Sequence, residues 1–225
     1  RGDYMEKYAA DYLTIALPKG KLFSLSAHLF QKIGITADNL SEKSRKLVIS
    51  NDAHKVQFII TKTSDVPTYV EYGAADIGII GKDVLLESEQ DVYELLDLGF
   101  GKCRLMMAVP REEKRAHLTD YAHTRVATKY PHIAEQFFAQ QGMQMEYIKL
   151  NGSIELGPIV GLSESIVDIV ETGTTLAEND LEEVVHIMDV SARLIANRVS
   201  FKLKFDRIYN IVNDLKQVLE SGEVR

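Results

Sequence analysis

Apolar and polar positions along this chain alternate between two periods. Short apolar runs predict strands, and the first three lie at residues 12–17, 47–50 and 56–61. Apolar residues at helical spacing from Leu22 to Ile33, followed by Gly34, predict a helix directly after the first strand. Strands that alternate with helices in this way are typical of an α/β fold.

The same two patterns continue through the rest of the sequence. Further strands are predicted at residues 76–80, 92–98, 103–109, 125–128, 145–150 and 166–170. Further helices are predicted at residues 65–72, 81–86, 133–141 and 205–220. Residues 184–197 form one long strand-like run, interpreted as the return of the chain to its first domain. We therefore expect two α/β domains, residues 12–102 with 188–225 and residues 103–187.

Composition and charge exclude several classes of protein. With 26 basic and 33 acidic side chains, the net charge of −7 disfavours a nucleic-acid binder. No apolar run reaches the roughly 18 residues that span a bilayer, and no signal peptide opens the chain. We therefore expect a cytoplasmic protein without a membrane segment. The single cysteine excludes an internal disulfide, and the six histidines show no metal-ligand spacing. Arg1 to Glu6 are interpreted as an expression remnant around a native start at Met5.

The stretch from Asp168 to Leu176 combines two carboxylates with a loop that favours an anion. The loop follows a strand and precedes a helix, whose first N–H groups and positive dipole end suit a phosphate. Gly173 permits close backbone approach, and Thr172, Thr174 and Thr175 offer hydroxyl donors. Because Asp168 and Glu171 would repel a phosphate, we expect them to face ribose hydroxyls. An ordinary helix start, with Thr172 as N-cap and Glu171 in solvent, explains the short pattern equally well.

Four cations lie beside other strand ends. Lys19 and Lys21 flank Gly20 at a helix start, where positive charge opposes the helix dipole unless an anion joins them. Arg45 precedes a predicted strand, and Lys62 follows the next one. Each could equally be a solvated surface side chain, so these positions are candidates for an anion site rather than proof of one.

Seven segments carry a family resemblance from about Leu13 to Lys204: ALPKGKL, SRKLVI, SDVPTYVEYGAADIGIIGKDVLLE, YELLDL, RVATKYP, IKLNGSIELGPIVGLSESIVDIVETGTTL and SARLIANRVSFK. In this order they resemble the ATP phosphoribosyltransferases, which catalyse the first step of histidine biosynthesis. The resemblance implies a two-domain fold like the type II periplasmic binding proteins, with the active site in the interdomain cleft. It also implies a reaction that joins N1 of ATP to C1 of phosphoribosyl pyrophosphate and releases pyrophosphate, with Mg²⁺ required.

The resemblance gives the candidate residues their roles. The loop Glu171–Thr175 is expected to hold the 5-phosphate of the ribosyl donor. Adenine N1 already has a lone pair, so the difficult step is the departure of pyrophosphate, which cations stabilise. Lys19, Lys21 and Arg45 are the candidates, and the family suggests that Arg45 reaches across a homodimer interface. Mg²⁺ is expected to arrive on the pyrophosphate without a dedicated protein cage. Glu155 either positions a substrate or packs its own turn.

One departure from the family pattern, and the position at which the sequence ends, affect this interpretation. The family often has arginine where this chain has Lys21, which keeps the charge but loses the planar fork. The sequence ends soon after the predicted helix 205–220, so it resembles the short form, which works with a subunit similar to histidyl-tRNA synthetase. Two alternatives remain: a solute-binding protein of the same bilobed fold, and a phosphoribosyltransferase for another base.

Overall fold

The computed structural model describes residues 11–222, which divide into two compact units. The first contains residues 11–101 and 191–222, and the second contains residues 102–190. The boundaries predicted after residues 102 and 187 lie one and three residues from those of the structure. The expected expression remnant, Arg1 to Glu6, lies outside the described residues.

The first unit is built on a six-stranded sheet with the order β2-β3-β1-β4-β11-β5. Its strands are β1 (Leu13–Pro18), β2 (Val48–Asn51), β3 (Val56–Thr61), β4 (Ile77–Gly81), β5 (Tyr93–Asp97) and β11 (Ala192–Ala196). The central strands β3, β1 and β4 are parallel, whereas β2, β11 and β5 run antiparallel to their neighbours. The carboxyl ends of the three parallel strands therefore meet at one edge of the sheet.

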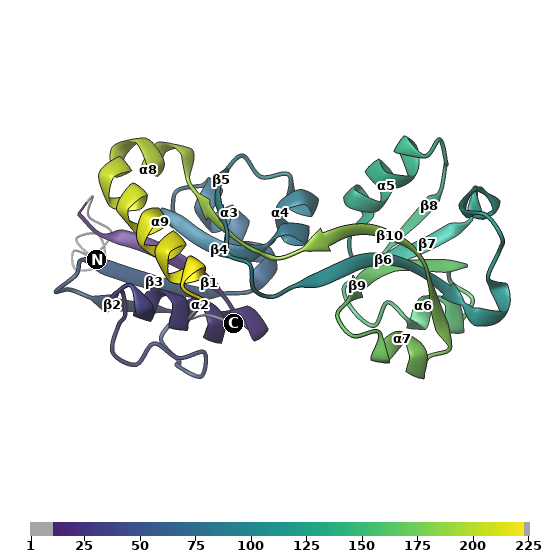
Figure 1. Cartoon of the computed structure of the whole chain (residues 1–225), viewed down its shortest axis with the longest axis horizontal. Helices are drawn as coiled ribbons and strands as arrows, with labels where there is room; N and C mark the ends of the chain where they lie inside the picture. The colour runs from purple at the N-terminus through teal and green to yellow at the C-terminus, as the bar shows by residue number, and fades with distance from the viewer. Residues whose placement is uncertain (1–10, 223–225) are drawn as a thin grey trace. The chain divides into compact units, whose positions relative to one another are not determined.

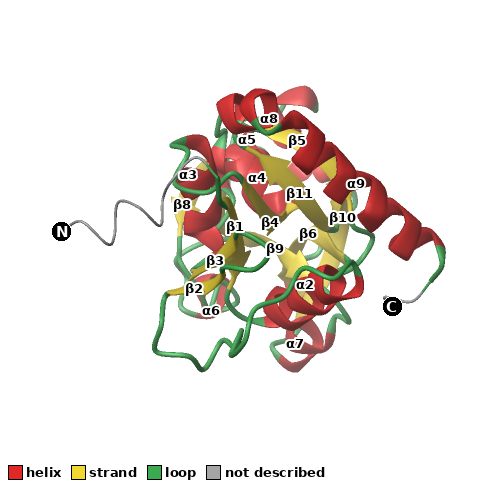
Figure 2. Ribbon diagram, turned by 90° about the vertical axis from the view of Figure 1, so that its left-hand side faces the viewer, coloured by secondary structure: helices red, strands yellow, loops and turns green. Residues whose placement is uncertain are grey.

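Helices cover both faces of this sheet. They are α2 (Lys21–Lys32), α3 (Val66–Glu71), α4 (Lys82–Ser88), α8 (Arg198–Leu203) and α9 (Phe205–Glu220), with a 3₁₀ turn η1 (Thr63–Asp65). Apolar side chains of α2 and α9 share one core with the sheet, and those of α3 pack on its other face. In the turned view, β1, β4 and β11 lie between α3 and α9 (Figure 2).

The amphipathic pattern explains why α9 forms where the sequence predicts it. Ile208, Ile211, Val212 and Leu215 recur at spacings of three or four and are all buried. Each such side chain stabilises the fold by about 1.5–3 kcal/mol relative to an exposed one. The polar face of the same helix stays in solvent, so the sequence period fixes which side of α9 meets the sheet.

The second unit contains a five-stranded sheet with the order β10-β6-β9-β7-β8. Its strands are β6 (Cys103–Pro110), β7 (Arg125–Thr128), β8 (Glu146–Lys149), β9 (Ser165–Val170) and β10 (Leu181–Val190). Its helices are η2 (Arg111–Glu113), η3 (Leu118–Tyr121), α5 (Pro131–Gln140), α6 (Leu156–Ile159) and α7 (Thr174–Glu178). β9, β7 and β8 are parallel, with α5 on one face of the sheet and α6 and α7 on the other (Figure 1).

The strand-like run predicted at residues 184–197 is two strands in two different sheets. β10 pairs with β6 as far as Val190, and β11 pairs with β4 from Ala192. Ser191 makes the change of partner: its carbonyl accepts from Lys82 N at 3.0 Å and its hydroxyl donates to Asp97 at 2.8 Å. The apolar pattern passes through this point without interruption, so the sequence alone could not show the break. Over residues 11–222, no helix is long and apolar enough to cross a membrane.

Candidate active site

Cationic candidates gather at the carboxyl edge of the first sheet. Pro18 pairs with Thr61 in the parallel β1–β3 ladder, so Lys19 and Lys62 leave adjacent strand ends. Lys19 N donates to Thr61 O at 2.8 Å, which fixes the two turns side by side. Lys19 and Lys62 are both exposed at the turns that follow β1 and β3. These two cations, distant in sequence, thus become neighbours because parallel strands end together.

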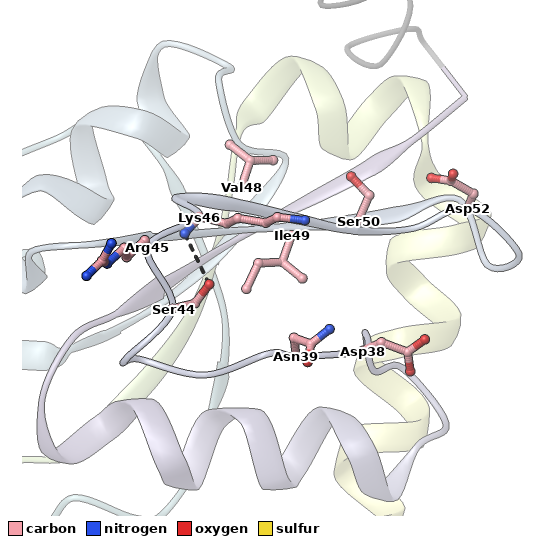
Figure 3. A pocket seen from close by; sticks show the side chains of 9 residues that line it. All are labelled: Asp38, Asn39, Ser44, Arg45, Lys46, Val48, Ile49, Ser50 and Asp52. Atoms are coloured by element: carbon pink, nitrogen blue, oxygen red, sulfur yellow. Dashed lines mark hydrogen bonds between the residues drawn. The ribbon is translucent and has the colours of Figure 1, made fainter.

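Arg45 lies at the same edge, because β2 starts there. Ile60 N, near the end of β3, donates to Leu47 O at 3.2 Å, which holds the start of β2 beside that strand end. Arg45 lines a surface hollow of about 530 Å³ between β2 and the preceding loop. Figure 3 shows its guanidinium pointing away from Asp38 and Asp52 at the other end of the hollow. Arg45 is exposed and forms no ion pair with any residue between 11 and 222.

The turn between β1 and α2 binds a carboxylate oxygen through a backbone N–H. Gly20 has φ +87°, a left-handed value that favours glycine, and it directly precedes Lys21, the first residue of α2. Its N–H donates to a carboxylate oxygen of Glu42 at 2.7 Å. A negatively charged group therefore already lies at this amide, as expected for a helix start with N–H groups to offer.

The second group of candidates lies at the carboxyl end of β9. Gly173 precedes α7 with φ +83°, so the helix begins at Thr174, two residues earlier than the sequence predicts. The alternative with Thr172 as N-cap is wrong: Gly173 holds that position and no side chain caps the helix. Thr172 Oγ1 instead lies 3.0 Å from Thr174 Oγ1 and 3.4 Å from Thr174 N. The hydroxyls of Thr172 and Thr174 thus lie together at this glycine turn, and Thr175 is exposed in the first turn of α7.

Asp168 and Glu155 belong to this same edge of the second sheet. Asp168 is half-buried on β9, opposite Met106 and on the sheet face that carries α6 and α7. Glu155 is half-buried and immediately precedes α6, which packs against β9. Glu171 is exposed and follows β9 directly. Because β7, β8 and β9 are parallel, the loops after all three lie on one side of the unit.

A strong ion pair marks the opposite edge of the second sheet, where the parallel strands begin. Arg125 N donates to Glu164 Oε2 at 2.8 Å, and the guanidinium contacts both carboxylate oxygens. The hydrogen bonds from Arg125 hold the pKa of Glu164 below its ordinary value, against a smaller opposing effect of burial. Nothing here resembles the glycine turn of the other edge, so we assign this pair a structural role.

Comparisons with known proteins identify the family. The HisG model, described as ATP phosphoribosyltransferase, matches residues 62–217. This chain belongs to the ATP phosphoribosyltransferase family. The family member from Syntrophotalea carbinolica is 54% identical over 211 residues, which cover 93% of this chain and 96% of the relative. The family predicted from the seven sequence segments is therefore confirmed.

Solved structures confirm the predicted fold class. The ATP phosphoribosyl transferase (HisG:HisZ) complex from Thermotoga maritima contains a chain with TM-score 0.79 and 32% identity, covering 93% of this chain and 99% of that one. The substrate binding protein of an amino acid ABC transporter matches with TM-score 0.62 and 12% identity, covering 95% of each chain. The second similarity shows the fold alone, which is the two-domain architecture of the binding proteins.

The structure also places residues that the sequence patterns did not single out. Glu42 reaches the Gly20 amide from 22 positions away, and no local pattern announces such a contact. Lys129 follows β7 as directly as Lys62 follows β3, and it is exposed beside the ring of Tyr130 at 5.9 Å. A cation directly after a parallel strand is the signal that could have identified Lys129. In the described part of the chain, no cluster of three or more His, Cys, Asp or Glu side chains could hold a metal.

Proposed function

We propose that this chain catalyses the transfer of a phosphoribosyl group from 5-phosphoribosyl 1-pyrophosphate to N1 of ATP. The products are N1-(5-phosphoribosyl)-ATP and pyrophosphate, and the reaction is the first step of L-histidine biosynthesis. Family membership supports the reaction, and the Gly173 turn supports the donor: it joins backbone N–H groups and threonine hydroxyls at a helix start. That combination suits a sugar phosphate better than an amino acid.

The two groups of residues divide the donor between them. The loop Glu171–Thr175 binds the 5-phosphate, and the carboxylates of Asp168, Glu171 and Glu155 accept hydrogen bonds from ribose hydroxyls. The lone pair of adenine N1 forms the new bond to C1 while the C1–O bond to pyrophosphate breaks. Negative charge therefore develops on the leaving group, and preorganised cations lower the barrier to its departure.

Lys19, Lys21 and Arg45 supply those cations, with Gly20 and Lys62 completing the binding turn. Their support is the topology of the first sheet, whose β1, β2 and β3 ends bring them to one edge. Mg²⁺ bound to the pyrophosphate adds charge neutralisation and keeps most of its water ligands.

We also propose two protein partners. A second copy of the chain forms a homodimer in which Arg45 extends to the neighbouring active site, which its exposure and lack of an ion pair within residues 11–222 permit. A regulatory subunit of the HisZ kind, similar to histidyl-tRNA synthetase, forms a hetero-oligomer with it. The support is the Thermotoga maritima complex, whose matching chain is covered to 99%.

One assay separates this function from its two alternatives. The purified chain is incubated with ATP, phosphoribosyl pyrophosphate and Mg²⁺, and pyrophosphate release is followed together with the absorbance of the product. We expect both signals, and neither when ATP is omitted. Turnover with another base in place of ATP would indicate a different phosphoribosyltransferase. Tight binding of an amino acid without turnover would indicate a solute-binding protein.

The regulatory partner has its own test. We expect the chain alone to be catalytic and insensitive to histidine, and to become inhibited by histidine when the HisZ-type subunit is added. Strong inhibition of the isolated chain by histidine would contradict the proposed division of labour.

A further inference from the structure

An ion pair lies beside the Gly173 turn. Arg104 donates two parallel hydrogen bonds to Glu183, at 3.2 Å from Nη1 to Oε2 and 3.1 Å from Nη2 to Oε1. The same Oε1 atom of Glu183 lies 3.6 Å from the position that a Cβ on Gly173 would occupy. Arg104 itself lies on β6 opposite Val170, the last residue of β9 before the loop.

We propose that Arg104 is a positioning residue for the donor's 5-phosphate, because it neutralises Glu183 beside the loop. This inference rests on the proposed function. Asp168 and Glu171 already place two carboxylates beside the loop, so an uncompensated Glu183 would be a third negative charge next to a bound phosphate. The repulsion would act over a few ångströms through a partly buried region, where charges are incompletely screened.

The geometry suits this role. The planar guanidinium satisfies both carboxylate oxygens at once, which holds the charge of Glu183 away from the phosphate and fixes its orientation. The side chains of Arg104 and Glu183 are 42% and 31% exposed, so the pair contributes little to folding by itself. Neither residue has another ionic partner within residues 11–222. A charge effect on the neighbouring loop is thus the main consequence of separating them.

The proposal predicts opposite effects for the two halves of the pair. Arg104→Gln leaves Glu183 charged and should raise the donor KM about fivefold, the upper range for a partly exposed charge interaction. Glu183→Gln leaves Arg104 charged and should lower the donor KM by a similar factor. The double variant Arg104→Gln/Glu183→Gln should have a donor KM near the wild-type value. Arg104→Lys keeps the positive charge, so its donor KM should also stay close to that of the wild type. The KM for ATP should remain unchanged in all four variants.

A purely structural ion pair predicts a different result. In that case Arg104→Gln and Glu183→Gln would both loosen the loop and raise the donor KM in the same direction. The matched control is the pair Arg125–Glu164, whose side chains are similarly exposed, at 39% and 29%, and which lies at the opposite edge of the same sheet. Arg125→Gln and Glu164→Gln should leave both KM values unchanged and lower the melting temperature only slightly, since this pair is as exposed as Arg104–Glu183.

The experiment is steady-state kinetics on the full chain with ATP, donor and Mg²⁺, alongside calorimetric titration of ribose 5-phosphate into each variant. Opposite shifts for Arg104→Gln and Glu183→Gln in both measurements support the proposal. Shifts of the same sign, or none, overturn it. Wild-type turnover with unshifted variants would refute this inference alone, whereas absence of wild-type turnover with ATP would refute the proposed function first.

Melting temperatures identify any variant that fails to fold. If Arg104→Gln is such a variant, the comparison moves to Arg104→Lys and Glu183→Gln in the ribose 5-phosphate titration. Near-wild-type affinity in Arg104→Lys with tighter binding in Glu183→Gln supports the proposal, and weaker binding in Glu183→Gln overturns it.

Discussion

The carboxyl edges of both sheets place a glycine with positive φ directly before a helix, and the side chains around the two glycines carry opposite charge. In the first, Gly20 has φ +87° and precedes α2; in the second, Gly173 has φ +83° and precedes α7. Lysines flank Gly20, whereas threonines and a carboxylate flank Gly173. In both places the first residues of the helix present N–H groups that have no partner within the helix. In the function we propose, the side chains around each glycine decide which end of the ribosyl donor that edge receives.

The difference also explains how acids can lie beside a phosphate loop. At the first edge, Glu42 contacts the Gly20 amide itself, which an incoming pyrophosphate would have to displace or bridge. At the second edge, Glu183 lies near Gly173 and is paired with Arg104. A carboxylate that is hydrogen-bonded to the amide competes with the ligand directly, whereas a nearby carboxylate that is paired with an arginine affects the ligand only through its charge.

The largest expected effect on activity comes from removing a cation at the carboxyl edge of the first sheet. Lys19→Met should lower kcat by about a hundredfold, since removing one preorganised charge-stabilising group typically costs that much. The KM for the donor should rise less, because the developing charge on pyrophosphate needs the cation most. Steady-state kinetics checks this, with Lys216→Met on the exposed face of α9 as the control. An equal loss of kcat in Lys19→Met and Lys216→Met would contradict a catalytic role for Lys19.

The next largest effect comes from replacing Gly173 in the turn at the carboxyl edge of the second sheet. Gly173→Ala should raise the donor KM about tenfold and leave the ATP KM alone, because an alanine in the left-handed region costs about 1–2 kcal/mol. Its Cβ has room at 3.6 Å from Glu183, so strain rather than collision is the cause. Gly142→Ala after α5 is the matched control, with φ +70° and open space around it. An unchanged donor KM in Gly173→Ala would argue against our assignment of the loop.

A smaller effect is expected from exchanging one cation for another at the carboxyl edge of the first sheet. Lys21→Arg introduces the planar guanidinium that the family often has at this position, which can donate two N–H groups to one phosphate. The variant should raise kcat/KM for the donor by about twofold to threefold. Lys21 is exposed at the first position of α2, so a longer side chain meets no packing constraint. Kinetics at fixed ATP measures the change. A fall in kcat/KM would mean that position 21 does not bind phosphate oxygens through its charge.

The smallest effect on activity comes from the structural edge of the second sheet. Arg125 lowers the pKa of Glu164, so the ionised carboxylate stabilises the folded state above its unfolded pKa of about 4.3. This contribution is lost as pH falls through the lower pKa of the folded state. Glu164→Gln should therefore be less stable than wild type near neutral pH, with the difference vanishing in acid. Urea denaturation across that range measures it, and a constant difference would exclude the linkage.

Local sequence patterns predicted much of the fold, but they did not predict which strands pair or which distant side chains form ion pairs. The buried run at residues 76–80 became β4, and the period-3.6 apolar face became α9, because burial imposes those patterns directly. The break at Ser191 was missed, since both strands around it are apolar and only their partners differ. Arg104 and Glu183 lie 79 positions apart, so no spacing rule could connect them.

The candidate site shows the same limit. The Gly173 turn and the Lys19–Lys21 turn were recognisable because each compresses its chemistry into a few consecutive residues. The gathering of Lys62 and Arg45 with Lys19 depends on which strands are neighbours, and that is a property of the sheet order. The role of each residue in binding and catalysis stays a prediction for the experiments above.

Amide hydrogen exchange tests the central claim, the division of the donor between two edges, most directly. The chain is compared alone, with ribose 5-phosphate, and with Mg²⁺–pyrophosphate. We predict that ribose 5-phosphate slows exchange at residues 171–176 and leaves residues 19–24 unchanged, while Mg²⁺–pyrophosphate does the reverse. Protection of residues 19–24 by ribose 5-phosphate, with none at residues 171–176, would contradict the account.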